Sequence, residues 1–134
     1  MNARVVTPLA WPSDAVLTMP GSKSAANRLL VAAALCRRPV TLHGVTPSDD
    51  VVHMVRGLQA LGYALAPGQE RESVRVTPPT PNVPGSAELH CGNAGTALRF
   101  LCAVAAITPG EWTLTGDTAM RTRPIGPLVA ALRE

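Results

Sequence analysis

The sequence predicts an α/β fold built from a repeated unit of strands and helices. Helices and strands alternate over the first 76 residues, and the same order of strand and helix starts again near Ala87. Hydrophobic residues make up 46% of the chain and charged residues 16%, which is typical of a globular protein. Aromatic residues reach only 3%, so we expect a core of leucine, valine and alanine. At 134 residues the chain has the length of one ordinary domain.

The first pass through the predicted unit ends at residue 76. We expect strands over 15–19, 40–45, 63–66 and 73–76 and helices over 24–36 and 50–61. Alanine and leucine dominate the first helix, and both favour helix formation. The second helix starts at Asp49 and Asp50, carries apolar side chains at helical spacing and is ended by Gly62.

The second pass begins after a proline-rich loop over 78–84. We expect a strand over 87–91, a helix that opens at 92–96 and runs to about 107, and a strand over 112–115. A last helix is expected to begin at Pro124, because proline is favourable at the first helical position. It shows no stop signal, so we expect a piece of a longer protein. The alternative is a small complete domain with a frayed final helix.

Composition excludes several classes of function. A net charge of +3 with scattered arginines and few aromatics argues against nucleic-acid binding. The longest apolar stretches, 29–36 and 101–107, are too short to cross a bilayer, and no signal peptide is visible. Cys36 and Cys102 fall in apolar stretches, which predicts buried free thiols in a reducing compartment. We therefore expect a cytoplasmic protein.

No metal site is predicted. The three cysteines are Cys36, Cys91 and Cys102, and their spacing does not match that of metal ligands. The spacing of the three histidines does not match either. His53 is expected on the exposed side of the second helix. His90, which precedes a glycine-rich loop, is expected to have a structural role.

Three helix starts favour binding of small anions. Lys23 is the only lysine among twelve basic residues and follows Gly21, and Ser24 and Arg28 share one helix face. Backbone N–H groups at such a start, with the helix dipole, attract anions. The alternative is that Ser22 or Ser24 merely caps the helix and that Arg28 is a solvated side chain.

The other two starts contain glycine or proline. Gly92 and Gly95 flank Asn93, and Thr96 and Arg99 share a face of the helix that follows; capping is the structural alternative for Asn93. Arg123 precedes Pro124, which holds it extended and suits a bidentate contact with carboxylate or phosphate. Taken alone, Arg123 fits a solvated surface arginine better. Together the three starts predict a pocket for one or two ligands with several negative charges.

These segments closely resemble the 5-enolpyruvylshikimate-3-phosphate synthase (EPSP synthase) family. The resemblance covers nearly the whole chain in order and spacing, and it rests on 20–28 (PGSKSAANR), 48–51 (SDDV), 60–62 (ALG), 92–99 (GNAGTALR) and 123–126 (RPIG). The related UDP-N-acetylglucosamine enolpyruvyl transferase has asparagine after its early lysine, so Ser24 favours the shikimate enzyme. Phe100 stands where many members have proline, which affects only helix packing.

The resemblance implies an incomplete enolpyruvyl transferase fold, an inside-out α/β barrel of βαβαββ units. Residues 1–20 would form an opening strand that joins the second domain, and 21–134 would be a truncated first domain. The full-length protein would be a 3-phosphoshikimate 1-carboxyvinyltransferase of the shikimate pathway. It would transfer the enolpyruvyl group of phosphoenolpyruvate to the 5-hydroxyl of shikimate 3-phosphate and release phosphate. No metal or organic cofactor is implied.

The resemblance also assigns roles to residues. Lys23 would be catalytic and contact both substrates, and Ser24 and Arg28 would hold the shikimate carboxylate. The phosphoenolpyruvate side, where glyphosate competes in this family, would be formed by Asn93, Gly95, Thr96, Arg99 and Arg123.

Length is the main departure from the family. The chain covers about the first third of such an enzyme and would lack the acid/base groups of the second domain. We therefore expect the missing C-terminal part of the same enzyme as its partner and the 134-residue chain alone to be inactive. Alternatives are a non-catalytic anion-binding module, a structural partner subunit or a relative of the UDP-N-acetylglucosamine enzyme.

Overall fold

The computed structural model describes residues 21–36, 38–79 and 85–134. The expected strand over 15–19 and most of the proline-rich loop lie outside these residues. The described elements are the helices α1 (Lys23–Leu35), α2 (Asp49–Ala60), α3 (Gly95–Ala106), α4 (Thr118–Arg121) and α5 (Gly126–Ala131), and the strands β1 (Val40–Leu42), β2 (Ala64–Pro67), β3 (Val74–Thr77), β4 (Ser86–His90) and β5 (Glu111–Thr115).

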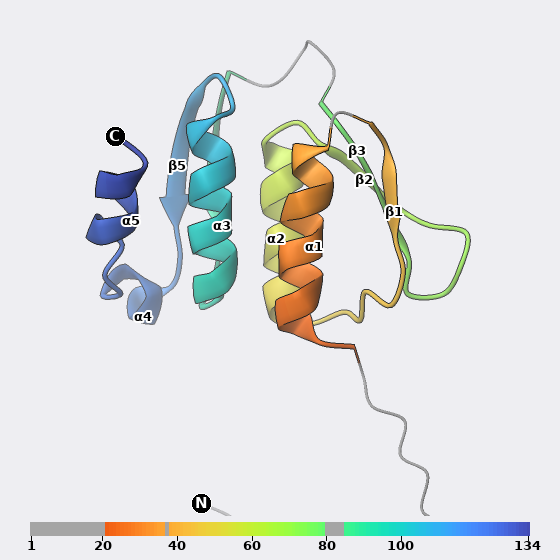
Figure 1. The fold of residues 1–134 in the computed structure, drawn as a ribbon. Coiled ribbons are helices and arrows are strands. Elements are labelled where there is room, and N and C mark those ends of the chain that lie inside the picture. Colours follow the sequence, from red (N-terminus) through yellow and green to blue (C-terminus); the bar gives the residue numbers. More distant parts are fainter. Residues whose placement is uncertain (1–20, 37, 80–84) are drawn as a thin grey trace, which may run out of the picture.

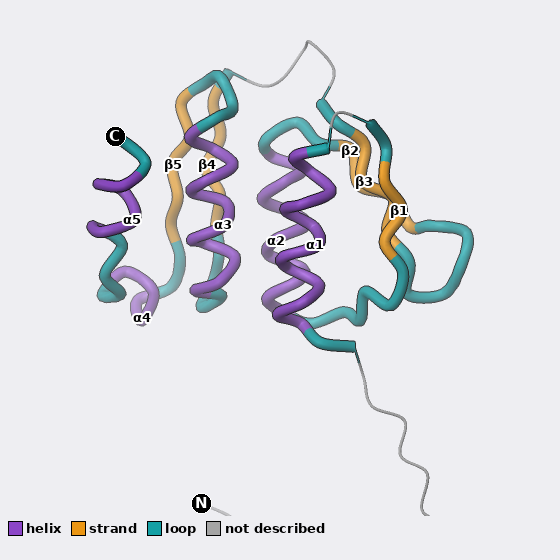
Figure 2. Tube along the Cα trace, viewed as in Figure 1, coloured by secondary structure: helices purple, strands orange, loops and turns teal. Residues whose placement is uncertain are grey.

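Three helices form the middle layer of the molecule, and the sheets lie outside them. Figure 1 shows α1, α2 and α3 side by side, and each of the three packs against the other two. Figure 2 shows strands β1–β3 on one side of these helices and β4–β5 on the other. This arrangement confirms the predicted α/β class.

The two sheets differ in topology. β3 is the central strand of the first sheet and pairs antiparallel with both β1 and β2. β4 and β5 pair in parallel through all five residues of each, and α3 is the crossover between them. The order helix, strand, helix, strand, strand, followed by a new strand and helix, is the predicted repeat.

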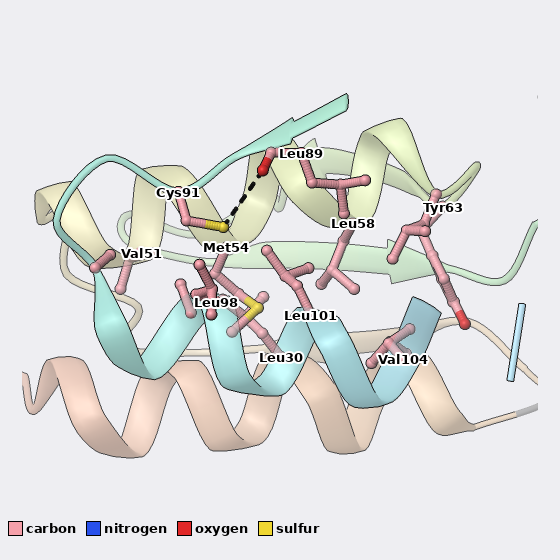
Figure 3. Packing of buried hydrophobic residues seen from close by; sticks show 14 of the residues in the cluster. Leu30, Val51, Met54, Leu58, Tyr63, Leu89, Cys91, Leu98, Leu101 and Val104 are labelled. Carbon is pink, nitrogen blue, oxygen red and sulfur yellow. Dashed lines mark hydrogen bonds between the residues drawn. The ribbon is translucent and has the colours of Figure 1, made fainter. Parts of the chain in front are cut away.

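The core lies where the three helices meet. Leu30, Met54 and Leu101, one from each helix, are fully buried. Figure 3 shows these side chains pointing toward one another, with Leu89 of β4 at the edge of the cluster. Leucine, valine and alanine make up most of the buried apolar set, as the scarcity of aromatics predicted. None of the helices in the described part of the chain is long and apolar enough to cross a membrane.

Both ends of α2 follow local sequence signals. The Ser48 side chain accepts a hydrogen bond from the Val51 N–H at the start of α2. Gly62 has a φ of 92°, and it lets the N–H groups of residues 62 and 63 bond back to the last turn. The prediction that Gly62 ends this helix is confirmed.

The last helix departs from the prediction. Pro124 lies before α5, which begins two residues later at Gly126 and ends at Ala131. The α3–α5 segment also contains the short helix α4, which was not predicted. Its N-cap is Asp117, whose carboxylate accepts a hydrogen bond from the Met120 N–H. Four residues are too few for a hydrophobic period to reveal a helix.

Gly57 allows α2 and α3 to approach closely. A Cβ at this position would meet the Leu101 side chain, with Cδ2 only 2.7 Å away. We expect Gly57→Ala to lower the free energy of unfolding by about 1 kcal/mol, because overpacking costs about 1–3 kcal/mol and alanine's better helix propensity returns about 1 kcal/mol. Urea unfolding followed by circular dichroism measures this change.

Gly126→Ala is the matched control. It is also a helical glycine, but a Cβ there would have no neighbour within 4 Å among the described residues. A Gly57→Ala protein as stable as the Gly126→Ala protein would contradict close packing at this helix crossing.

Candidate functional site

The helices of the middle layer all begin at the same end of the molecule. Figure 1 shows α1, α2 and α3 running in the same direction, so that Lys23, Asp49 and Gly95 mark one face, which we call the N-terminal face. Helix N-termini present unpaired N–H groups and partial positive charge. In α2 the carboxylates Asp49 and Asp50 offset this charge. The first turns of α1 and α3 have no acidic residue.

The first predicted motif lies on this face and is open to solvent. Lys23 Nζ is 3.7 Å from Asp50 Oδ1, and 61% of the lysine side chain is exposed. The Ser22 hydroxyl caps α1 by accepting a hydrogen bond from the Ala25 N–H. The sequence does not distinguish Ser22 from Ser24 as the residue that caps α1, and the structure assigns this role to Ser22. The exposed Ser24 hydroxyl is therefore not used as the cap.

Arg28 links the first motif to α3. Its Nη1 donates to the backbone carbonyl of Ser24 at 3.0 Å. Its guanidinium carbon lies 6.0 Å from the centre of the Phe100 ring. The guanidinium thus lies between the first turns of α1 and the Phe100 ring of α3.

Gly21 has a packing role that the sequence did not reveal. Its N–H donates to Thr46 Oγ1 at 3.0 Å, and a Cβ would lie 2.6 Å from the Gly44 carbonyl oxygen. Only glycine allows this contact without displacing the loop before α2. Thr46 is 25 residues away, and nothing local in the sequence identifies it.

The second and third motifs meet in space. Arg123 Nη2 donates to Asn93 Oδ1 at 2.7 Å, across 30 residues. A Cβ on Gly95 would be 2.6 Å from Arg123 Nη1, so the guanidinium lies directly against the first residue of α3. The alternative role of Asn93 as helix cap is wrong: the N-cap is Ala94, and no side chain caps α3.

Arg99, on α3, connects the two segments of this junction through hydrogen bonds to backbone carbonyls. Its Nη1 donates to the Gly95 carbonyl at 3.3 Å and its Nη2 to the Pro124 carbonyl at 3.0 Å. It therefore ties α3 to the backbone that follows Arg123. Thr96, partly buried, lies in the same first turn of α3.

A cavity of about 520 Å³ lies beside Arg123. It is lined by Leu98, Leu114, Thr115, Gly116, Met120, Arg121, Arg123 and Ile125. Lys23 and Arg28 do not line it. This cavity is therefore not the expected concavity shared by Lys23, Arg28 and Arg123. Two contacts nevertheless join the motifs: Arg28 lies near Phe100 of α3, and Arg123 donates a hydrogen bond to Asn93.

Arg121 is a lining residue that sequence reasoning did not select. It lies in the last turn of α4, and its Nε donates to the Gly116 carbonyl at 3.2 Å. This bond turns a second guanidinium toward the cavity wall beside Arg123. The only signal in the sequence was its position two residues before Arg123.

Two predictions about polar side chains need correction. Cys36 is exposed, because it follows the last turn of α1, whereas Cys102 is partly buried and Cys91 fully buried. His53 is only partly exposed, and its Nδ1 lies 3.0 Å from the His90 carbonyl. No three metal-binding side chains gather within residues 21–36, 38–79 and 85–134.

Comparison with solved structures identifies the fold. EPSP synthase from Acinetobacter baumannii superposes with a TM-score of 0.72 over 87% of this chain and 26% of that chain, at 22% identity. The chain therefore has part of the enolpyruvyl transferase fold, as the motifs predicted.

Sequence comparison identifies the family. The model of the EPSP synthase (3-phosphoshikimate 1-carboxyvinyltransferase) family matches residues 12–134. The 3-phosphoshikimate 1-carboxyvinyltransferases of Salmonella agona and Salmonella typhimurium are each 40% identical over 136 residues, which cover all of this chain and 32% of the relative. The chain belongs to the EPSP synthase family. It spans about a third of the length of these curated relatives.

The buried thiol beside the glycine loop gives a test of the site's packing. Burial raises the pKa of Cys91 to about 11. At pH 8 only on the order of one thiol in a thousand would then be ionised, and the thiolate is the reactive form. We expect iodoacetamide at pH 8 to modify exposed Cys36 and to spare Cys91, as measured by peptide mass spectrometry.

Unfolding in urea is the control, since it should make all three cysteines reactive. Rapid labelling of Cys91 in the folded protein would show that the segment between β4 and α3 opens to solvent, contrary to the packing described above.

Proposed function

We propose that the full-length protein transfers the enolpyruvyl group of phosphoenolpyruvate to the 5-hydroxyl of shikimate 3-phosphate and releases phosphate. The observation that carries this proposal is the junction of Arg123, Asn93 and Gly95 at the start of α3. It places a guanidinium, held by an amide, against a helix N-terminus without acidic residues. Both features favour a compact, multiply charged anion.

In this proposal, phosphoenolpyruvate binds at the junction. Arg123 supplies a bidentate donor, Asn93 holds it in place, and Gly95 leaves room for it. Arg99 and Thr96 shape the wall behind. Phosphate and carboxylate groups each present two or more acceptor oxygens, which suits the paired N–H donors of a planar guanidinium. Glyphosate, which carries the same two kinds of anionic group, would compete here.

Shikimate 3-phosphate would bind at the first motif. The Ser24 hydroxyl and the Arg28 guanidinium lie one helical turn apart on α1, which suits a carboxylate. Lys23, exposed at the first position of the helix, would contact both substrates as a mobile point charge. Lys23 is the catalytic residue that this chain would supply.

The remaining chemistry would come from the part of the enzyme beyond this chain. Asp49 and Asp50 serve the start of α2, and the cavity beside Arg123 is lined by no carboxylate among the described residues. The missing C-terminal part would supply the acid and base, and its closure would exclude water from the cleft. We also propose a cytoplasmic location, since the three free cysteines suit a reducing compartment.

Phosphate release tests the activity directly. The full-length protein is expected to release phosphate only when phosphoenolpyruvate and shikimate 3-phosphate are both present. The 134-residue chain alone is expected to release none, because its cationic groups remain in water, where charge interactions are weak. A phosphate-coupled absorbance assay with product detection by mass spectrometry measures both proteins.

Lys23→Met in the full-length protein links this activity to the site. Its ion pair with Asp50 is exposed, so we expect an unchanged melting temperature. Loss of a charge-assisted contact should lower kcat/KM by roughly 10–100-fold. Full activity in this variant would refute the role of Lys23. Binding of both ligands without turnover by the unmodified protein would instead support an anion-binding module.

Gly95→Ala tests the junction. The added methyl group would displace the Arg123 guanidinium, whose Nη1 lies 2.6 Å from the Cβ position. We expect the KM for phosphoenolpyruvate to rise by roughly tenfold or more, because a hydrogen bond to a charged group is weakened. The KM for shikimate 3-phosphate should change little. Steady-state kinetics with each substrate varied in turn measure the two constants.

Gly126→Ala is again the control, since a Cβ there contacts nothing in the part of the chain that the structure describes. If Gly95→Ala bound phosphoenolpyruvate as the unmodified protein does, the position of Arg123 against α3 would not matter for binding.

A further inference from the structure

His53, on α2, packs against the glycine-rich loop over 92–96 and forms a hydrogen bond to the residue two positions before that loop. Its Nδ1 is 3.0 Å from the carbonyl oxygen of His90, the last residue of β4. A carbonyl can only accept, so Nδ1 of His53 carries the proton. This bond joins α2 to the chain two residues before Gly92.

Gly92 packs directly against the His53 ring. Its φ is 52°, in the left-handed region that favours glycine, and a Cβ would collide with His53 Nε2 and lie 2.9 Å from Cε1. The imidazole therefore fills the space that a side chain at residue 92 would occupy. The ring fixes the turn from one side while the hydrogen bond to His90 holds it at its start.

Gly92 in turn connects the two segments that form the Arg123 junction. Its N–H donates to His90 Nδ1 at 3.3 Å, and its carbonyl accepts from the Asp117 N–H at 3.0 Å. On one side the chain continues directly to Asn93. On the other side Asp117 caps α4, and the Arg123 N–H bonds to the Met120 carbonyl of that helix. The turn at Gly92 thus sets the relative position of Asn93 and Arg123.

His53 itself faces a different space from the proposed substrates. With Arg56 and Gly57 of α2 and Glu88 and His90 of β4 it lines a cavity of about 250 Å³, which shares no lining residue with the cavity beside Arg123. The contacts of His53 that lead toward the Arg123 junction are its hydrogen bond to His90 and its packing against Gly92.

We propose that His53 is a positioning residue for the phosphoenolpyruvate side of the site, acting through its Nδ1–H bond to His90 and its contact with Gly92. The proposal rests on the proposed function. It concerns the geometry of Asn93 and Arg123, and it assigns His53 no contact with substrate.

Two substitutions separate the hydrogen bond from the bulk of the ring. His53→Asn keeps a donor close to the position of Nδ1, whereas His53→Leu keeps similar volume and removes the donor. We expect His53→Leu in the full-length enzyme to raise the KM for phosphoenolpyruvate roughly three- to tenfold, the effect of one neutral hydrogen bond. The KM for shikimate 3-phosphate should stay constant, and His53→Asn should restore most of the loss.

Hydrogen exchange provides a readout that does not depend on activity. Peptides that span 91–97 should exchange faster in His53→Leu than in the unmodified protein, and His53→Asn should again restore protection. His43→Leu is the control: its ring is also within hydrogen-bond distance of one group, Glu70 Oε2 at 3.1 Å, but it lies before α2 and away from the glycine loop.

The outcomes are distinct. An unchanged KM for phosphoenolpyruvate together with unchanged exchange in His53→Leu would overturn the proposal. A lower melting temperature with unchanged KM would also overturn it, because His53 would then serve folding alone. If the unmodified enzyme showed no transferase activity, the proposed function would fail, while the exchange data would still decide whether His53 positions the loop.

Discussion

Parallel packing of three helices, with all N-termini on one face, is the constraint on which the rest of the structure depends. Aligned helix dipoles bring like partial charges together, so the arrangement must be stabilised by apolar burial of side chains such as Leu30, Met54 and Leu101. Gly57 lets two of the helices approach closely enough for that burial. Part of this electrostatic cost lies at the N-terminal face, where anions can offset it. In α2 the chain's own carboxylates do so, whereas the first turns of α1 and α3 hold no acidic residue.

Glycine serves this face in three different physical ways. Gly21 allows backbone to pack on backbone at the loop before α2, and Gly95 leaves space for the Arg123 guanidinium. Gly92 adopts a left-handed conformation against His53. A glycine-rich motif is often interpreted only as a backbone site that binds a ligand. Here its glycines are also required by the protein's own side chains, so their substitution alters the position of binding groups as well as the space for a ligand.

Local signals in the sequence were sufficient for the long elements and insufficient for the site. Helical periodicity and Gly62 predicted α2 within one residue at each end, and alanine-rich composition predicted α1. Asn93 has the sequence signature of a cap, yet its side chain holds Arg123, because a charged donor 30 residues away competes for the same oxygen. The contact of His53 with His90 spans 37 residues, and that of Gly21 with Thr46 spans 25. No local pattern encodes such pairings, since they arise from how the elements pack.

The first motif is exposed to solvent, and its ion pair is therefore weak. Lys23 and Asp50 are 3.7 Å apart in a solvent-exposed setting, where a high dielectric constant makes their attraction weak. In the proposed function, a phosphorylated ligand, which carries more charge than one carboxylate, would compete with Asp50 for Lys23. Exclusion of water would strengthen this new contact, because the Coulomb energy scales with the product of the charges and inversely with the dielectric constant. In the proposed function, domain closure would thus convert a weak surface ion pair into a substrate contact.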